Sequence, residues 1–243
     1  MMRQQDNMNS PRYIAVIPDG NRRCAKRLLK TPWKGHEWGV SKVKRLFDWS
    51  KDFGIKTITF YALSLENLEK RPKNEIKYLF KLANKELSDI IVNKDNFVHE
   101  NEIRMTFFGN LHLLPEELQG VIQKVTDITK DYKKYAINFA LAYGGRQEIT
   151  DACRKIALGV EAGKITPGDI NEMIIRHSLQ TNGYGDPDLI IRTGGEKRLS
   201  NFLLFQSAYS ELAFVDTLWP DFKKDEFVKV IRDYQHRDRR FGK

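Results

Sequence analysis

Hydrophobic residues recur along this chain with two different periods. Short runs rich in β-branched and aromatic residues alternate with stretches in which apolar residues return every three or four positions. The short runs predict six strands, at residues 13–17, 55–63, 103–108, 136–143, 188–192 and 212–215. The other stretches predict helices around residues 43–50, 76–91, 115–128, 149–160, 169–178 and 227–234. Strands that alternate with helices predict a single α/β domain with a mainly parallel, six-stranded sheet flanked by helices.

Two helical stretches have pronounced apolar faces. The stretch at 76–91 carries Leu79, Phe80, Ala83 and Leu87, which form either the wall of an apolar tunnel or ordinary core. The stretch at 149–160 carries Ile149, Cys153, Ile156 and Val160 at the spacing of one helix face. Residues 202–205 are also apolar and have the length of a buried strand or a short helix face.

No linker, repeat or low-complexity tract interrupts this pattern. We therefore expect a flexible N-terminus at residues 1–12 and one domain at residues 13–243. No window reaches the roughly 18 apolar residues of a membrane span, and the polar first residues do not resemble a signal peptide. The two cysteines, Cys24 and Cys153, are too few for a disulfide framework or a zinc site and suit a reducing compartment. We expect a cytoplasmic protein.

The composition is that of a globular protein, and its net charge indicates an anionic binding partner. Hydrophobic residues make up 41% and charged residues 30% of the chain, which excludes disordered, collagen-like and disulfide-scaffold proteins. Lys and Arg number 41 against 32 Asp and Glu, so the formal net charge is 41 − 32 = +9. This surplus indicates an anionic partner: a nucleic acid, a phosphorylated metabolite or an acidic membrane surface. The positions of the arginines have to decide among them.

A first polar cluster, residues 18–23, follows the first predicted strand. A glycine-containing turn between a strand and a helix directs backbone N–H groups to one spot, which favours a phosphate. Arg22 and Arg23 add charged donors, and Asp19 could hold Mg²⁺ against the same phosphate oxygens. An ordinary Asp-Gly-Asn turn explains the same residues equally well.

Two further clusters follow other predicted strands. Residues 64–68, with Arg71 just beyond, are polar enough for a binding loop, but they also suit a helix start capped by Ser64 or Asn67. Residues 192–201 contain two arginines, a serine and a Gly-Gly turn, which predicts a second diphosphate site. Arg192 ends a strand of buried character, where a cation without a partner would be costly.

Common motifs of other enzyme classes are absent. The sequence has no GxxxxGK[ST] or GxGxxG loop, no HExxH, and no Asp-Asp-x-x-Asp run of the kind found in all-helical prenyl synthases. Its basic residues gather at strand ends rather than along one helix face. That distribution favours a compact diphosphate over nucleic acid as the ligand.

Taken together, these segments resemble the cis-prenyltransferase (undecaprenyl diphosphate synthase) family, in particular its archaeal and eukaryotic branch. The resemblance covers most of residues 13–243 in order and is carried by residues 17–23, 35–36, 61–67, 71–72, 142–146, 188–205, 209–212, 218–222 and 240–242. It implies the cis-prenyltransferase fold and a homodimer. It also implies Mg²⁺-dependent condensation of isopentenyl diphosphate with an allylic prenyl diphosphate to a Z-configured polyprenyl diphosphate.

The resemblance also implies roles for individual residues. Asp19 would hold Mg²⁺, and Glu211 resembles a second acid of the metal site. Asn67 matches the position usually assigned as proton acceptor; because an amide is a poor base, we expect it to orient a diphosphate oxygen that takes the proton. The remaining residues expected to contact substrate are Gly20, Asn21, Arg22, Arg23, Cys24, His36, Ser64, Leu65, Glu66, Leu68, Arg71, Arg192, Arg198, Leu199, Ser200, Arg240 and Gly242.

Cys24 and Leu68 depart from the family pattern, because both stand where family members usually have Trp. Losing two large rings would reshape the allylic site and leaves the acceptor, product length and regiochemistry open. The alternative function is a non-catalytic regulatory subunit of a heteromeric cis-prenyltransferase, although Asp19, Asn67 and Arg192 favour an enzyme. Charge left over from the two diphosphate sites suits a peripheral contact with an anionic bilayer.

Overall fold

Six parallel strands form one sheet in the computed structural model, which describes residues 9–31 and 33–237. The strand order is β3-β4-β2-β1-β5-β6, and every neighbouring pair is parallel. The strands are β1 (Tyr13–Ile17), β2 (Thr57–Ser64), β3 (Ile103–Phe108), β4 (Tyr135–Tyr143), β5 (Leu189–Arg192) and β6 (Glu211–Phe214). This confirms the predicted α/β fold, with all six strands within two residues of their expected ends.

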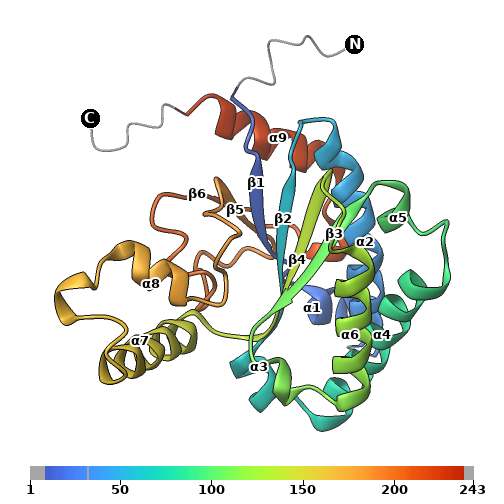
Figure 1. The fold of residues 1–243 in the computed structure, drawn as a ribbon. Helices are drawn as coiled ribbons and strands as arrows, with labels where there is room; N and C mark the ends of the chain where they lie inside the picture. The colour runs from blue at the N-terminus through green and yellow to red at the C-terminus, as the bar shows by residue number, and fades with distance from the viewer. Residues whose placement is uncertain (1–8, 32, 238–243) are drawn as a thin grey trace.

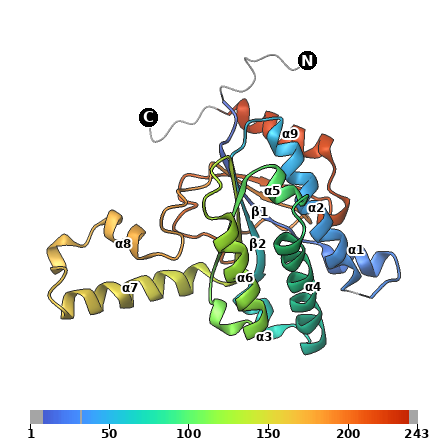
Figure 2. The ribbon, with the colours of Figure 1, turned by 45° about the vertical axis from the view of Figure 1, so that its right-hand side comes forward.

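Helices connect the strands and form the outer layers. They are α1 (Asn21–Arg27), α2 (Lys34–Lys51), α3 (Leu65–Lys70), α4 (Lys73–Val92), α5 (Phe97–Glu100), α6 (Glu116–Thr129), α7 (Gly145–Glu161), α8 (Glu172–Ser178) and α9 (Lys224–Gln235), with short 3₁₀ turns at 111–113, 167–169 and 219–221. Figures 1 and 2 show α2, α4 and α6 side by side along one side of the sheet. Helices α7 and α8 pack on each other and extend from the opposite side.

The core follows from the alternation of side chains along the strands. In β1, Ile14 and Val16 belong to the main apolar cluster, which they share with residues of α2, α4, α6 and α9. Ala15 and Ile17 belong to a second cluster, which includes Tyr61, Tyr143 and Phe202. Both faces of the central strands are therefore buried, as expected for a parallel sheet.

Three expectations of the sequence are corrected. Cys153, on the apolar face predicted for this helix, is exposed, whereas Ile156 of the same face is buried together with Gly145, Glu148 and Ala152 of α7. Residues 202–205 form turns, not a strand or helix. The helix expected at 169–178 is divided into a 3₁₀ turn at 167–169 and α8. Among the described residues, no helix is long and apolar enough to cross a membrane.

Candidate active site

The carboxyl ends of β1, β2 and β5 meet at one edge of the sheet and border a polar cleft of about 710 Å³, a size typical of small-molecule sites. The three strands are neighbours in the sheet, so the residues that follow them are brought together from distant parts of the chain. Residues of all three predicted clusters, together with His36, line this polar cleft: Asp19, Asn21, Ser64, Glu66, Asn67, Arg71, Arg192, Arg198, Ser200 and Asn201.

Arg192 lies at the centre of the polar cleft. Its side chain is 5% exposed and donates from Nη2 to Asp19 Oδ2 at 2.9 Å and from Nη1 to Ser200 Oγ at 2.7 Å. Nη1 also donates to the backbone carbonyl of Arg198, whereas the buried Nε has no partner among the described residues. One guanidinium thus connects the first and third predicted clusters and keeps a donor free for a ligand.

Helix α1 begins directly after β1 and borders a second hollow beside the polar cleft. This α1 pocket is lined by Asp19, Gly20 and Arg22, among others, and Arg23 in its wall lies 3.2 Å from Asp19 Oδ1. Gly20 allows the sharp turn because its φ of 109° lies in the left-handed region. The pocket is therefore rich in cationic donors near a single carboxylate.

A buried carboxylate organises the side of the α1 pocket that faces α4. Glu75 is 3% exposed and lies 3.1 Å from His36 Nε2, 3.6 Å from Arg71 Nη1 and 3.6 Å from Arg22 Nε. Burial lowers the pKa of His36, although the hydrogen bond to Glu75 acts in the opposite direction. Burial also lowers the pKa of the Arg71 guanidinium, whose Nε has no partner among the described residues.

Helices α1 and α2 approach closely at Gly35. A Cβ at this position would collide with the Asn21 carbonyl oxygen, so only glycine allows α2 to pack this tightly on α1.

The second cluster is both a helix start and a wall of the cleft. Ser64 caps α3, because its hydroxyl accepts from the Asn67 backbone N–H at 3.1 Å. This arrangement leaves the Asn67 side chain exposed on the cleft. Asn201 reaches across from the third cluster and donates to Glu66 Oε1 at 2.9 Å. The two loops are therefore joined by a side-chain hydrogen bond.

The third cluster adopts a strained backbone that its neighbours hold in place. Ser200, Asn201 and Leu203 have positive φ angles of 52°, 67° and 45°. Phe202, between them, stacks on Tyr61 with ring centroids 4.5 Å apart, and Tyr61 Oη donates to the Ser200 carbonyl at 3.3 Å. Strain of this kind is often stored at functional sites, where it presents a side chain to a ligand.

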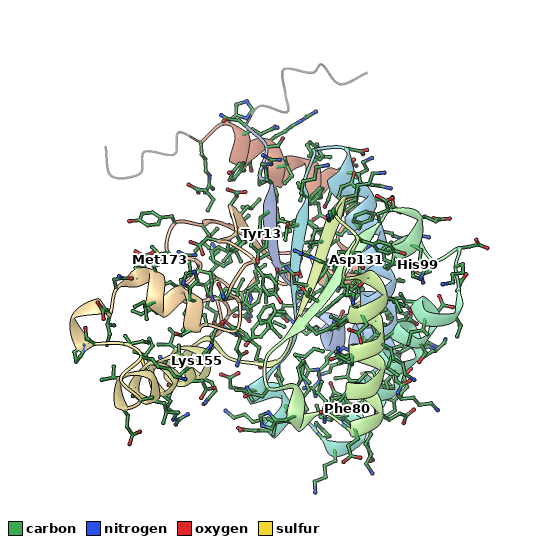
Figure 3. The ribbon with its side chains drawn as sticks, in the orientation of Figure 1. Tyr13, Phe80, His99, Asp131, Lys155 and Met173 are labelled. Carbon is green, nitrogen blue, oxygen red and sulfur yellow. The ribbon has the colours of Figure 1, made fainter. Side chains whose placement is uncertain are left out.

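An apolar cavity opens from the polar cleft. Pro18, Asn21 and His36 line both hollows, and the cavity continues between α2, α4, α6 and the sheet. Leu79, Phe80 and Ala83 lie in its wall, whereas Leu87 is buried in the core. Figure 3 shows Phe80 near the lower parts of α4 and α6. The site thus suits a ligand with an anionic head and an apolar tail.

Comparisons with known proteins agree on one family. Residues 17–242 match the family model described as "Putative undecaprenyl diphosphate synthase". The chain belongs to this family, the cis-prenyltransferases. A Methanopyrus kandleri relative, a tritrans,polycis-undecaprenyl-diphosphate synthase (geranylgeranyl-diphosphate specific), is 46% identical over 96% of this chain and 85% of its own. A Thermoplasma volcanium protein of the same description is 43% identical over 100% and 93%.

A solved structure supports the same assignment. Lavandulyl diphosphate synthase from Lavandula x intermedia, in complex with dimethylallyl diphosphate, matches with a TM-score of 0.89 and 36% identity over 96% of this chain and 99% of that one. The protein is therefore a prenyltransferase with the cis-prenyltransferase fold, and the interpretation as a non-catalytic subunit loses its basis.

Several residues expected at the site of this cis-prenyltransferase are not found in the walls of the polar cleft, the α1 pocket or the apolar cavity. Cys24, on the buried side of α1, is 1% exposed and lies between Asp221 and Arg27; burial raises the pKa of its thiol. Leu65, Leu68 and Leu199 pack against the apolar clusters. Arg240 and Gly242 lie outside the described residues.

Glu211 lies away from Asp19 within the chain. It begins β6 and pairs in register with Leu189, three positions before the carboxyl end of β5, and its carboxylate pairs with Arg237. The structure therefore does not bring the two predicted metal ligands together.

Glu75, Tyr61 and Asn201 are site residues that the sequence patterns did not predict. Glu75 was hidden because its partners come from α1 and α2, although its spacing of four from Arg71 was a weak signal. Tyr61 and Asn201 lie inside the matching motifs, but nothing in their types indicates that they hold another loop.

Asp19 and its surroundings are compatible with Mg²⁺. Residues 9–31 and 33–237 contain no group of three or more acidic, His or Cys side chains that could hold a metal. Mg²⁺, however, commonly takes one or two carboxylates and completes its shell with substrate phosphates and water. Asp19 supplies such a carboxylate on the polar cleft.

Proposed function

We propose that this protein condenses isopentenyl diphosphate with geranylgeranyl diphosphate and extends the chain with Z double bonds. The observation that carries the proposal is the junction at Asn21 and His36, where a cleft lined by arginines opens into an apolar cavity. An allylic diphosphate with a long tail is amphiphilic in the same way. The archaeal relatives named above support geranylgeranyl diphosphate as the acceptor.

Each of the two diphosphates would be bound by its own group of residues. Arg192, Arg198 and Ser200 would bind the diphosphate of isopentenyl diphosphate, since Arg192 Nε is buried and free to donate. Arg22, Arg23 and Arg71, around the α1 pocket, would bind the allylic diphosphate. Because α1 also lies at the mouth of the apolar cavity, the allylic tail would extend toward Leu79 and Ala83.

The reaction breaks one bond and forms another. The allylic C–O bond breaks and its electrons leave with the diphosphate, while the isopentenyl double bond attacks the allylic carbon and C2 loses a proton. Negative charge grows on the leaving diphosphate, so fixed guanidinium groups at the α1 pocket stabilise the transition state. Mg²⁺, held by Asp19 when bound, would add a Lewis acid at the same oxygens.

Asn67 would act on the proton indirectly. Its side chain is exposed on the cleft between the two diphosphate positions. An amide is too weak a base to remove a proton from carbon, but it donates well to a phosphate oxygen. We propose that Asn67 orients a diphosphate oxygen, which then accepts the C2 proton.

We also propose that the protein acts as a homodimer. Helices α7 and α8 extend from the body and leave Leu158 and Met173 exposed at 64% and 63%. A second copy would cover such side chains. Light scattering of the purified protein would report a monomer if this part of the proposal were wrong.

The deciding experiment supplies purified protein with labelled isopentenyl diphosphate, Mg²⁺ and single acceptors from dimethylallyl to geranylgeranyl diphosphate. We expect elongation from geranylgeranyl diphosphate, with new Z double bonds by NMR. Asp19→Asn should abolish condensation. The control Asp131→Asn should not, because Asp131 is exposed and lines neither the polar cleft nor the α1 pocket. A branched product from dimethylallyl diphosphate alone would contradict the proposed regiochemistry. Absence of condensation with every acceptor would overturn the proposed function.

A further inference from the structure

The connection between α1 and α2 exposes an unusual concentration of apolar side chains. Leu28, Leu29 and Trp33 are 50%, 95% and 36% exposed. We call these three residues the apolar tip. Single exposed apolar residues are common on protein surfaces, but three within six positions on one projecting segment indicate a partner. Figure 2 shows this segment at the edge of the molecule, beyond α1.

Leu29 is not explained by folding. It follows the C-terminal cap of α1 and adopts a φ of 52°, in the left-handed region where glycine is the usual residue. A leucine in this conformation costs about 1–2 kcal/mol, and at 95% exposure it regains almost nothing by burial. The turn itself is well formed, because the Lys30 N–H donates to the Ala25 carbonyl at 2.9 Å. The leucine side chain is thus held outward on an ordered turn.

Basic residues surround the apolar tip. Residues 26–34 include Lys26, Arg27, Lys30 and Lys34 and no acidic residue. Arg27 and Lys34 pair with Asp221 and Glu37, respectively. Lys26 and Lys30 are exposed and make no ion pair with other described residues. Cations next to exposed leucine and tryptophan are typical of protein segments that lie in the headgroup region of an anionic bilayer.

The apolar tip also adjoins the proposed ligand site. Lys26, Leu29 and Lys30 line the mouth of the α1 pocket, which also contains Arg22 and Arg23. Trp33 lies beside α4, with its ring centroid 6.2 Å from that of Tyr78. Insertion of the tip would therefore bring the pocket mouth to the depth of lipid phosphates.

We propose that the apolar tip and its lysines dock this protein on an anionic membrane. Leu28, Leu29 and Trp33 enter the interface, Lys26 and Lys30 contact lipid phosphates, and the α1 pocket opens toward the bilayer surface. An amphiphilic diphosphate could then pass from the membrane into the pocket without crossing bulk water. The docking itself does not depend on catalysis, so it can be tested independently of the proposed function.

The test measures co-sedimentation with vesicles of phosphatidylcholine, with or without phosphatidylglycerol. We expect binding only where phosphatidylglycerol is present, and weaker binding at high salt. Asn tolerates the left-handed conformation of this turn, so Leu29→Asn removes the apolar side chain without straining the backbone. The loss of one inserted leucine should weaken vesicle binding about tenfold. The control Val92→Ser, at an equally apolar position 78% exposed on α4, should leave binding unchanged.

A charge variant tests the second half of the surface. Lys30→Gln should weaken binding to phosphatidylglycerol vesicles about fivefold, the effect expected for one lysine at an anionic surface. Lys155→Gln on α7, which Figure 3 places on the opposite side of the molecule from α2, should not. Equal binding of wild type, Leu29→Asn and Lys30→Gln would overturn the proposal. So would a change of oligomeric state in Leu29→Asn without vesicles, since that result would assign the tip to a contact between chains.

Discussion

Replacing Arg192 by lysine separates the geometry of the guanidinium from its charge. Arg192 is buried, and its two terminal nitrogens bond to Asp19, Ser200 and the Arg198 carbonyl at once. Lysine keeps the positive charge but has one nitrogen on a flexible stem, so it cannot serve both sides of the cleft. The variant therefore loses at least one hydrogen bond to a charged or buried partner, and also the free Nε donor.

The expected loss follows from the worth of such a bond. A hydrogen bond to a charged group contributes about 1.5–3 kcal/mol, which corresponds to roughly a 10- to 150-fold fall in kcat/KM. The fall should appear when isopentenyl diphosphate is varied at saturating acceptor, because Arg192 faces that proposed site. Steady-state incorporation of labelled isopentenyl diphosphate measures it directly.

A matched substitution controls for the change of residue type. Arg154 on α7 pairs with Asp151 at 2.7 Å, but its side chain is 66% exposed. Arg154→Lys should leave kcat/KM unchanged, because an exposed pair contributes little. If Arg192→Lys retained wild-type kcat/KM with the same melting temperature, charge alone would suffice and the fork geometry would have no catalytic value.

Three further predictions rest on other parts of the site. Burial lowers the pKa of His36 below its usual value of 6.5, so the unfolded chain binds more protons than the folded one as pH falls. The free energy of unfolding should therefore keep its full value above about pH 6.5 and fall as the pH drops below it. In urea unfolding between about pH 5 and pH 8, His36→Gln should make this fall shallower. The same pH dependence in the variant and the wild type would contradict this. Asn201→Ala removes the bonds to Glu66 and the Arg146 N–H and should lower the unfolding free energy by about 2 kcal/mol, whereas the exposed Asn182→Ala should not. Ala83→Phe would fill part of the apolar cavity and should shorten the product seen by mass spectrometry; the same product length as in the exposed control Ala157→Phe would exclude the cavity as the path of the tail.

Local pattern sufficed for the strands because each is short and strongly apolar. β1 and β3 begin and end where the hydrophobic runs do, and the ends of the other strands differ by one or two residues. Periodicity was less informative for α7. Its apolar residues are spaced as one face, but the structure buries Ala152 and Ile156 and leaves Cys153, between them in the sequence, exposed to solvent. A sequence shows which face of a helix is apolar, not whether the rest of the protein reaches that face.

The polar site shows the same division between local and distant causes. Ser64 was expected either to cap a helix or to line a binding loop, and it does both, since each depends on neighbours within a few residues. Glu75 could not be interpreted in this way. Its partners His36 and Arg22 lie 39 and 53 positions earlier, and only the packing of α1, α2 and α4 brings these charges together.

The order of the strands decides which polar loops become the site. In the sequence the loops after all strands look alike, whereas the sheet places β2, β1 and β5 side by side. Ile17 and Arg192 are paired in register, and for that reason Asp19 and Arg192 meet although 173 positions separate them. The loop after β4 is equally glycine-rich, but its N–H groups at 145 and 146 donate to Asn201 and hold that loop from outside the cleft. Exchange of strand positions would therefore dismantle the site even if every motif were retained.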